Sequence, residues 1–170
     1  MKKTGLLFVS MLLLVLMSGC GEIKDAMDIT FTIDKSNVFS VDENSLTTSS
    51  YNLDLNDSEE YRKYKGKIRN VEIDYVRYSI TSNTGGGGQV DLYANVYGGP
   101  FATATKVAGP IGFAAGELRG VTDVAWLNKG YFESLLASGQ LTVWAVATGT
   151  NVHVTLPVEV RVRVTVNVFE

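Results

Sequence analysis

The side chains that most often carry out chemistry are scarce in this sequence, which has one cysteine, Cys20, and one histidine, His153. A cysteine nucleophile needs a base held beside it by a fold, and a disulfide needs a second cysteine. Only an apolar segment precedes Cys20, so both roles are disfavoured there, as is that of a small buried hydrophobe. His153 belongs to no H-E-x-x-H motif and the chain has no G-x-S-x-G, so we expect an exposed sheet residue and neither a metal nor another cofactor.

Carboxylates are plentiful, and two of them brought together by a fold could act as the acid and base of a hydrolase. Nothing in their spacing singles out a pair among Asp54, Asp57, Glu59, Glu60, Asp74, Asp91, Glu117 and Asp123. The run from Asp54 to Ser58 begins like an EF-hand calcium loop, but Glu59 stands where that loop needs glycine. Residues 85–88 are four glycines without the Lys-Ser/Thr pair of a phosphate-binding loop, so we expect a mobile hairpin tip.

The first twenty residues have the layout of a secretory signal. Residues 2–3 are lysines, residues 6–17 form an apolar run broken only by one serine, and the small residues 18–19 precede Cys20. A permanent membrane-spanning helix needs about 20 apolar residues. This run has 12, so we expect a cleaved signal rather than a span.

Residues 16–21, Leu-Met-Ser-Gly-Cys-Gly, resemble the lipobox of bacterial lipoproteins. In that family small residues precede a cysteine that receives a diacylglycerol and becomes the new N-terminus after cleavage; Met17 stands where the family usually has leucine. The resemblance implies a lipid on Cys20 and a protein anchored to a membrane outside the cytoplasm. An aspartate after the cysteine would signal retention at the inner membrane in that family, so Gly21 implies the outer membrane in a cell that has one.

The charge balance of the chain disfavours nucleic acid as a partner. The chain has 15 basic and 18 acidic residues, and loss of residues 1–19 removes two lysines and leaves a formal net charge of −5. No basic stripe is left to attract phosphates. The remaining 151 residues suit one domain with a sizeable core.

Alternation of apolar and polar residues predicts that most of the chain is β-strand. It is clearest over residues 152–168, where every even position is aliphatic and the odd positions are mostly polar. At about 3.3 Å per residue this run would be roughly 56 Å long, so we expect Pro157 to interrupt it at a sheet edge or a crossover. In residues 71–80 the apolar phase shifts by one residue, which predicts a β-bulge near Tyr75–Val76.

The other elements complete an all-β domain. Acidic residues before basic ones predict a helix near residues 57–66, and an Asn128 cap with a Gly139 stop predicts a second near 128–139. We expect residues 34–50 to be largely loop. The prediction is therefore a tether over 20–27 and one antiparallel β-sandwich of immunoglobulin-like architecture over 28–170, with one or two short helices; a closed β-barrel is the alternative.

Two tyrosines are the candidate binding surface. If Val90, Leu92 and Ala94 face the core, Tyr93 and Tyr97 face outward, where tyrosines can stack on sugars or dock on proteins. Tyrosine is also an ordinary strand former, and we expect both tryptophans to be packed.

Three functions remain open at this point. The first is a lipid-anchored, non-enzymatic domain of the cell envelope that binds or supports another envelope protein or a carbohydrate. The second is a hydrolase with two carboxylates, which would need two acids of raised pKa in one cleft. The third is a carrier of an apolar ligand, which needs a cavity of at least about 300 Å³. The sequence favours the first.

Overall fold

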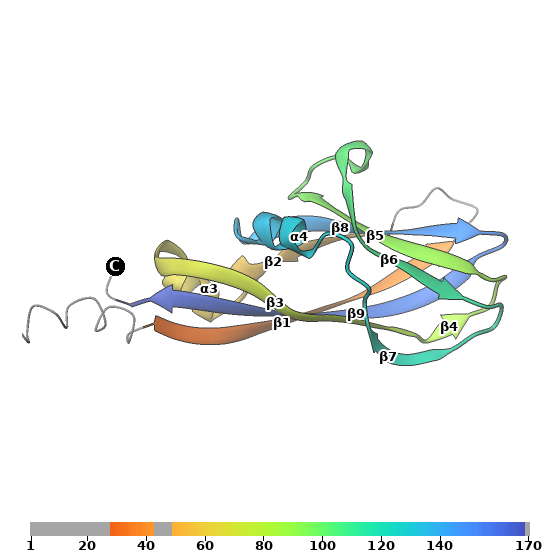
Figure 1. The fold of residues 1–170 in the computed structure, drawn as a ribbon, viewed down its shortest axis with the longest axis horizontal. Helices are drawn as coiled ribbons and strands as arrows, with labels where there is room; N and C mark the ends of the chain where they lie inside the picture. Colours follow the sequence, from red (N-terminus) through yellow and green to blue (C-terminus); the bar gives the residue numbers. More distant parts are fainter. Residues whose placement is uncertain (1–27, 43–48, 169–170) are drawn as a thin grey trace, which may run out of the picture.

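The computed structural model describes residues 28–42 and 49–168. These form two antiparallel sheets packed face to face (Figure 1). Sheet A has the order β1 (Asp28–Asp42), β9 (His153–Asn167), β3 (Ile68–Ile80) and β7 (Arg119–Asp123), and β4 (Ser82–Asn83) also pairs with β9. Sheet B has the order β2 (Ser49–Asp54), β8 (Gln140–Gly149), β5 (Gly88–Val96) and β6 (Thr105–Phe113). Within the described residues the two sheets stay separate, so the predicted sandwich is confirmed and the closed-barrel alternative is wrong.

The valine-rich strand β9 lies at the centre of sheet A. Its even positions are buried against sheet B, as the alternation predicts. The prediction that Pro157 would interrupt the strand is wrong, because β9 runs for 15 residues without a break and Pro157 pairs with Val38 of β1.

Proline is tolerated at this central position because of a gap in the hydrogen-bond ladder. The carbonyl of Thr155 accepts from the N–H of Thr81, 3.1 Å away, on the side of β3 and β4. Backbone polar groups alternate sides along a strand, so the nitrogen of Pro157 points to that same side. There the pairing of β9 with β3 stops at Val158 and resumes at Thr155 opposite Ser82 of β4. The missing N–H of Pro157 therefore coincides with an interruption of the sheet.

Strand β1 is much longer than the sequence suggested, since it continues to Asp42 through residues expected to be loop. Its odd-numbered residues all face the same side of the sheet, and three of them, Ile33, Phe39 and Val41, are buried. Lys35 and Asn37 are also at odd positions. Because they are polar, they break the alternation of apolar and polar residues that would have predicted a strand here. The Nζ of Lys35 lies 3.3 Å from Oδ2 of Asp57.

The predicted bulge in β3 is confirmed. The register of β3 against β9 shifts between Ile73 and Tyr75, so that Asp74 is the extra residue. Val71 and Ile73 before the shift and Val76 after it are all buried, although they differ in phase. The bulge restores the core face, as expected from the sequence.

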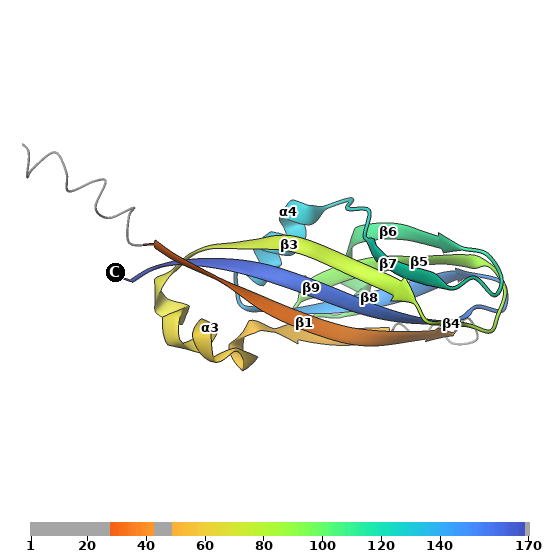
Figure 2. The same ribbon diagram turned by 90° about the horizontal axis from the view of Figure 1, so that it is seen from below.

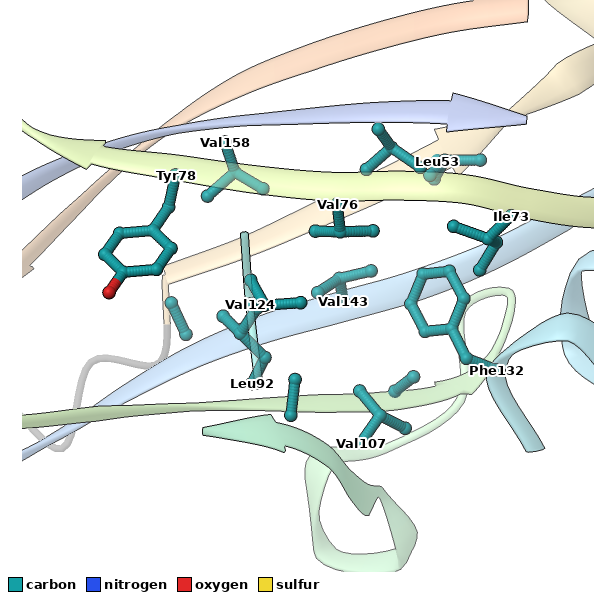
Figure 3. Close-up of a cluster of buried hydrophobic side chains, with 14 of the residues drawn as sticks. Leu53, Ile73, Val76, Tyr78, Leu92, Val107, Val124, Phe132, Val143 and Val158 are labelled. Carbon is teal, nitrogen blue, oxygen red and sulfur yellow. The ribbon is translucent and has the colours of Figure 1, made fainter. Parts of the chain in front are cut away.

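Two short helices form where they were predicted. In α3 (Glu59–Tyr64) Ser58 caps the N-terminus by accepting from the N–H of Tyr61, and in α4 (Lys129–Leu136) Asn128 accepts from the N–H of Tyr131. Helix α4 contacts β3 of sheet A and three strands of sheet B, so it closes the open side between the sheets. Figure 3 shows its Phe132 pointing toward Ile73 and Val76 of the common core.

The four-glycine segment is not a mobile hairpin tip. It connects β4 of sheet A to β5 of sheet B and packs against the chain between β8 and β9. A Cβ on Gly86 would lie 2.2 Å from the carbonyl oxygen of Thr150, and the N–H of Gly86 donates to Asn151 O at 2.6 Å. Glycine is required here for close approach of two backbones.

The sandwich is elongated, and its two ends differ (Figures 1 and 2). One end carries the start of β1, the end of β9 and the turn from α3 to β3; Asp28 pairs with Asn167 there. The other end carries β4 and the turn between β6 and β7. None of the helices in the described part of the chain has the length and apolar character needed to span a membrane.

Candidate functional site

Cys20, the predicted lipidation site, lies outside the described residues, as do the signal and the whole tether. The first described residue is Asp28, eight residues further along the chain. Asp28 begins the edge strand β1, so the chain enters the domain at the end of the sandwich that also holds Asn167.

Tyr93 faces outward from sheet B, as predicted, but it does not stand alone. It pairs with Trp144 of β8, and Phe101 packs over both rings, with centroids 5.3 Å from Tyr93 and 5.9 Å from Trp144. Phe101 belongs to a short 3₁₀ helix, η3 (Phe101–Thr103), between β5 and β6. The three rings form an aromatic cluster on the outer face of sheet B.

Tyr97 lies just beyond the end of β5 rather than on the strand with Tyr93. Its neighbours Val96 and Phe101 are also exposed, by 56% and 39%, and Tyr97 itself by 49%. We call residues 96–104 the aromatic loop; Figure 1 shows it rising above sheet B at the top of the view. The loop thus exposes three large apolar side chains to water.

The aromatic loop is held in place by hydrogen bonds from the strands beneath it. Asn95 Nδ2 donates to Pro100 O at 2.9 Å and to Thr103 Oγ1 at 2.8 Å. The N–H of Gly98 donates to Thr142 Oγ1 at 2.9 Å, and Thr142 donates in turn to Asn52 Oδ1 at 2.7 Å. A loop held this way loses little conformational freedom when it binds a partner.

A buried charge lies beside the aromatic cluster. Asp91 is 7% exposed, and its Oδ2 is 2.8 Å from Nζ of Lys106. Its Oδ1 has no hydrogen-bond partner within the described residues. Gly109 makes room for this carboxylate, because a Cβ there would lie 2.7 Å from Oδ1.

The outer face of sheet A is polar and carries several ion pairs. Arg161 forms two hydrogen bonds to Asp34, at 2.7 and 2.9 Å, and these lower the pKa of Asp34. Tyr75 lies between Arg77 and Arg161, whose guanidinium carbons are 4.1 and 5.1 Å from its ring centroid.

His153 lies on the same outer face of sheet A, where the sequence placed it. Its Nδ1 is 2.6 Å from Oδ1 of Asp42, on the neighbouring strand β1. Within the described residues no group of three or more His, Cys, Asp or Glu side chains could hold a metal ion.

Most of the carboxylates considered for hydrolysis are bonded to separate partners. Asp91, Asp123, Asp74 and Glu117 pair with Lys106, Arg77, Arg163 and Arg119, respectively. Burial tends to raise the pKa of Asp54, but hydrogen bonds from Gln140 and Asn56 outweigh it and lower the pKa. A hydrogen bond from the N–H of Ala114 and another from Arg119 lower the pKa of Glu117. The lowered pKa favours the ionised form of Asp54 and Glu117, which is the opposite of what a general acid needs.

The apolar cavity between the sheets is small. It has a volume of about 30 Å³ and is lined by core side chains such as Phe39, Leu92 and Phe132. A site for a small organic ligand occupies roughly 300 Å³ or more. A larger groove, about 550 Å³, lies between the α3–β3 turn and α4, but its lining mixes Lys65 and Arg69 with Glu72 and Glu133.

The sequence did not indicate that Trp144 and Phe101 lie together on the outer face of sheet B. Trp144 is packed, as expected, with 6% exposure, yet it lies outside the core between the sheets. Alternation along β8 could have predicted this position. Leu141, Val143 and Ala145 face the core, so Trp144 between them must face the opposite side of the sheet. Phe101 carried no such signal, since only the fold of the loop brings it onto the sheet.

Comparisons with known proteins do not identify a family. No protein-family model matches the sequence, and no curated protein matches it. Among solved structures, a chain of the structure of infectious bursal disease virus Gx strain is similar with a TM-score of 0.35 and 15% identity, over 84% of this chain and 34% of that chain. This chain thus spans about a third of the length of the viral chain.

Proposed function

We propose that this protein is a bacterial lipoprotein of the cell envelope, held to a membrane by a lipid on Cys20. Its β-sandwich is a non-enzymatic domain that binds or supports an envelope protein or a carbohydrate. The observation that carries this proposal is the position of the chain's one cysteine, directly after an apolar signal and eight residues before the first strand of the domain.

The physical argument for anchoring rests on acyl chains. Each buried methylene contributes about 0.8 kcal/mol, so one chain holds a protein marginally and two or more hold it stably. A diacylglycerol on Cys20 would meet this requirement without a spanning helix.

The aromatic loop is the proposed binding surface, with Tyr97 and Phe101 at its exposed side and Tyr93 supporting Phe101 from the sheet. Its support is the combination of exposed apolar side chains with a backbone fixed by Asn95 and Thr142. Aromatic residues in such positions provide much of the energy of protein and sugar binding.

The change Cys20→Ser tests the anchor. We expect the variant to lose the lipid completely, because serine has no thiol to receive the diacylglycerol. The measurement is incorporation of a labelled fatty acid into the protein, with Ser36→Ala as a control that leaves the signal intact. A Cys20→Ser protein that still incorporates the fatty acid would contradict the proposal.

A photo-crosslinking side chain at Val96 tests the binding surface in cells. We expect a discrete adduct, reduced about tenfold or more by Tyr97→Ser combined with Phe101→Ser, because hot-spot aromatics each contribute about 2 kcal/mol or more. Thr32, exposed on the outer face of sheet A, is the matched control position. Equal adducts at both positions, or an adduct at Val96 that survives the double change, would count against this surface.

A further inference from the structure

The stretch Arg62–Arg69 concentrates positive charge in an acidic protein. It holds five of the chain's 15 basic residues and no acidic one: Arg62, Lys63, Lys65, Lys67 and Arg69. The rest of the chain after residue 19 has eight basic residues against 18 acidic ones. We call this stretch the basic turn; it comprises the second half of α3, the 3₁₀ helix η2 (Lys65–Lys67) and the start of β3.

The basic turn lies at the end of the sandwich where the chain enters from Cys20. Lys67 Nζ donates to Val168 O at 2.9 Å, and Arg69 Nη1 is 3.4 Å from Oδ2 of Asp28. Figures 1 and 2 both show the α3–β3 turn beside the start of β1. Eight residues can span at most about 28 Å, so a lipid on Cys20 keeps this end close to the membrane.

Most of these cations are directed to solvent. Arg62, Lys63 and Lys65 are exposed. Lys63 lies over the ring of Tyr64, 5.0 Å from its centroid, and Lys65 donates to the amide oxygen of Asn56 at 2.8 Å. Neither contact neutralises the charge. Glu59 and Glu60 in the first turn of α3 offset two of the five cations, and Glu60 interacts with Lys63, so the turn remains net positive.

We propose that the basic turn docks on the anionic phospholipid headgroups of the membrane that holds Cys20. This inference rests on the proposed lipid anchor. Each Lys or Arg close to an anionic surface gains about 1 kcal/mol, within a Debye length of about 10 Å. The same surface repels the acidic remainder of the domain. The two effects orient the long axis away from the membrane and leave the aromatic loop open to a partner.

The test uses the full chain, purified from the membranes of cells that express it and placed on vesicles. Because Cys20 is the only cysteine, Gly66→Cys supplies one labelling site within the turn, where an added Cβ meets no atom within 4 Å. Ala115→Cys supplies an exposed site at the opposite end. An environment-sensitive fluorophore reports contact with headgroups.

We expect the Gly66 label to report headgroup contact on vesicles with 30% phosphatidylglycerol, and to lose it on pure phosphatidylcholine or in 0.5 M salt. The Ala115 label stays in water throughout. Combining Arg62→Gln, Lys63→Gln and Lys65→Gln lowers the ratio of docked to undocked protein about 100-fold, at about fivefold per charge. The matched control removes three charges elsewhere: Arg77→Gln, Lys129→Gln and Arg163→Gln.

The outcomes separate docking from anchoring. If the lipid anchor is wrong, the unsubstituted protein does not float with vesicles in 1 M salt. If the anchor holds and docking is wrong, the protein floats, but the Gly66 signal is the same on charged and neutral vesicles. An equal loss of signal in the control triple variant would also overturn the proposal, because it would reflect net charge rather than the turn.

Discussion

Replacing Lys106 with methionine is expected to lower the free energy of unfolding by about 2–4 kcal/mol, since it leaves a buried carboxylate without its cation. Asp91 is 7% exposed, and the Nζ of Lys106 is the charge that its Oδ2 contacts, at 2.8 Å. The Lys106 side chain is 33% exposed, so water offsets part of the loss. Chemical denaturation monitored by tryptophan fluorescence measures the change.

Two further variants control this prediction. Lys129→Met removes a lysine from a more exposed pair with Glu133, and we expect a loss below about 1 kcal/mol. Adding Asp91→Asn to Lys106→Met removes the buried charge and is expected to recover about 1 kcal/mol or more. If Lys106→Met were as mild as Lys129→Met, the buried pair would not have the importance assigned to it.

Gly139→Ala is expected to destabilise the fold by about 2–4 kcal/mol, from backbone strain and overpacking together. Gly139 follows α4 with a φ of +87°, and a Cβ there would lie 2.6 Å from Oη of Tyr61. Tyr61 is 1% exposed and has no room to withdraw. Thermal and denaturant unfolding both measure the effect.

Gly130→Ala is the matched control. Gly130 lies inside α4, and a Cβ there would meet no atom within 4 Å. Alanine favours helix over glycine by about 0.8–1 kcal/mol, so this variant is expected to gain stability. A loss in both variants would show that α4 tolerates no change, and the argument from the contact with Tyr61 would fail.

Local rules predicted the elements that depend on local interactions. The bulge at Asp74 follows from the phase shift in β3, and both helices form where they were predicted, the second with the predicted cap Asn128. The two-layer architecture followed from alternation, because each strand must bury one face.

Features that depend on distant partners could not be predicted. Pro157 fits in a central strand only because β3 gives way to β4 opposite it, and that gap involves residues about 80 positions earlier. Strand β1 continues past Lys35 by pairing with β9 over its whole length, a partner more than 100 positions away. The covering of Tyr93 and Trp144 by Phe101 likewise depends on a loop that folds back from the end of β5.

The central claim is that Cys20 carries a lipid and begins the mature chain. Mass spectrometry of the native protein, extracted from membranes and digested, tests this most directly. We expect an N-terminal peptide that starts at Cys20 and is heavier than its sequence by a diacylglycerol. A peptide with residues 1–19 still attached and a free thiol at Cys20 would contradict the account.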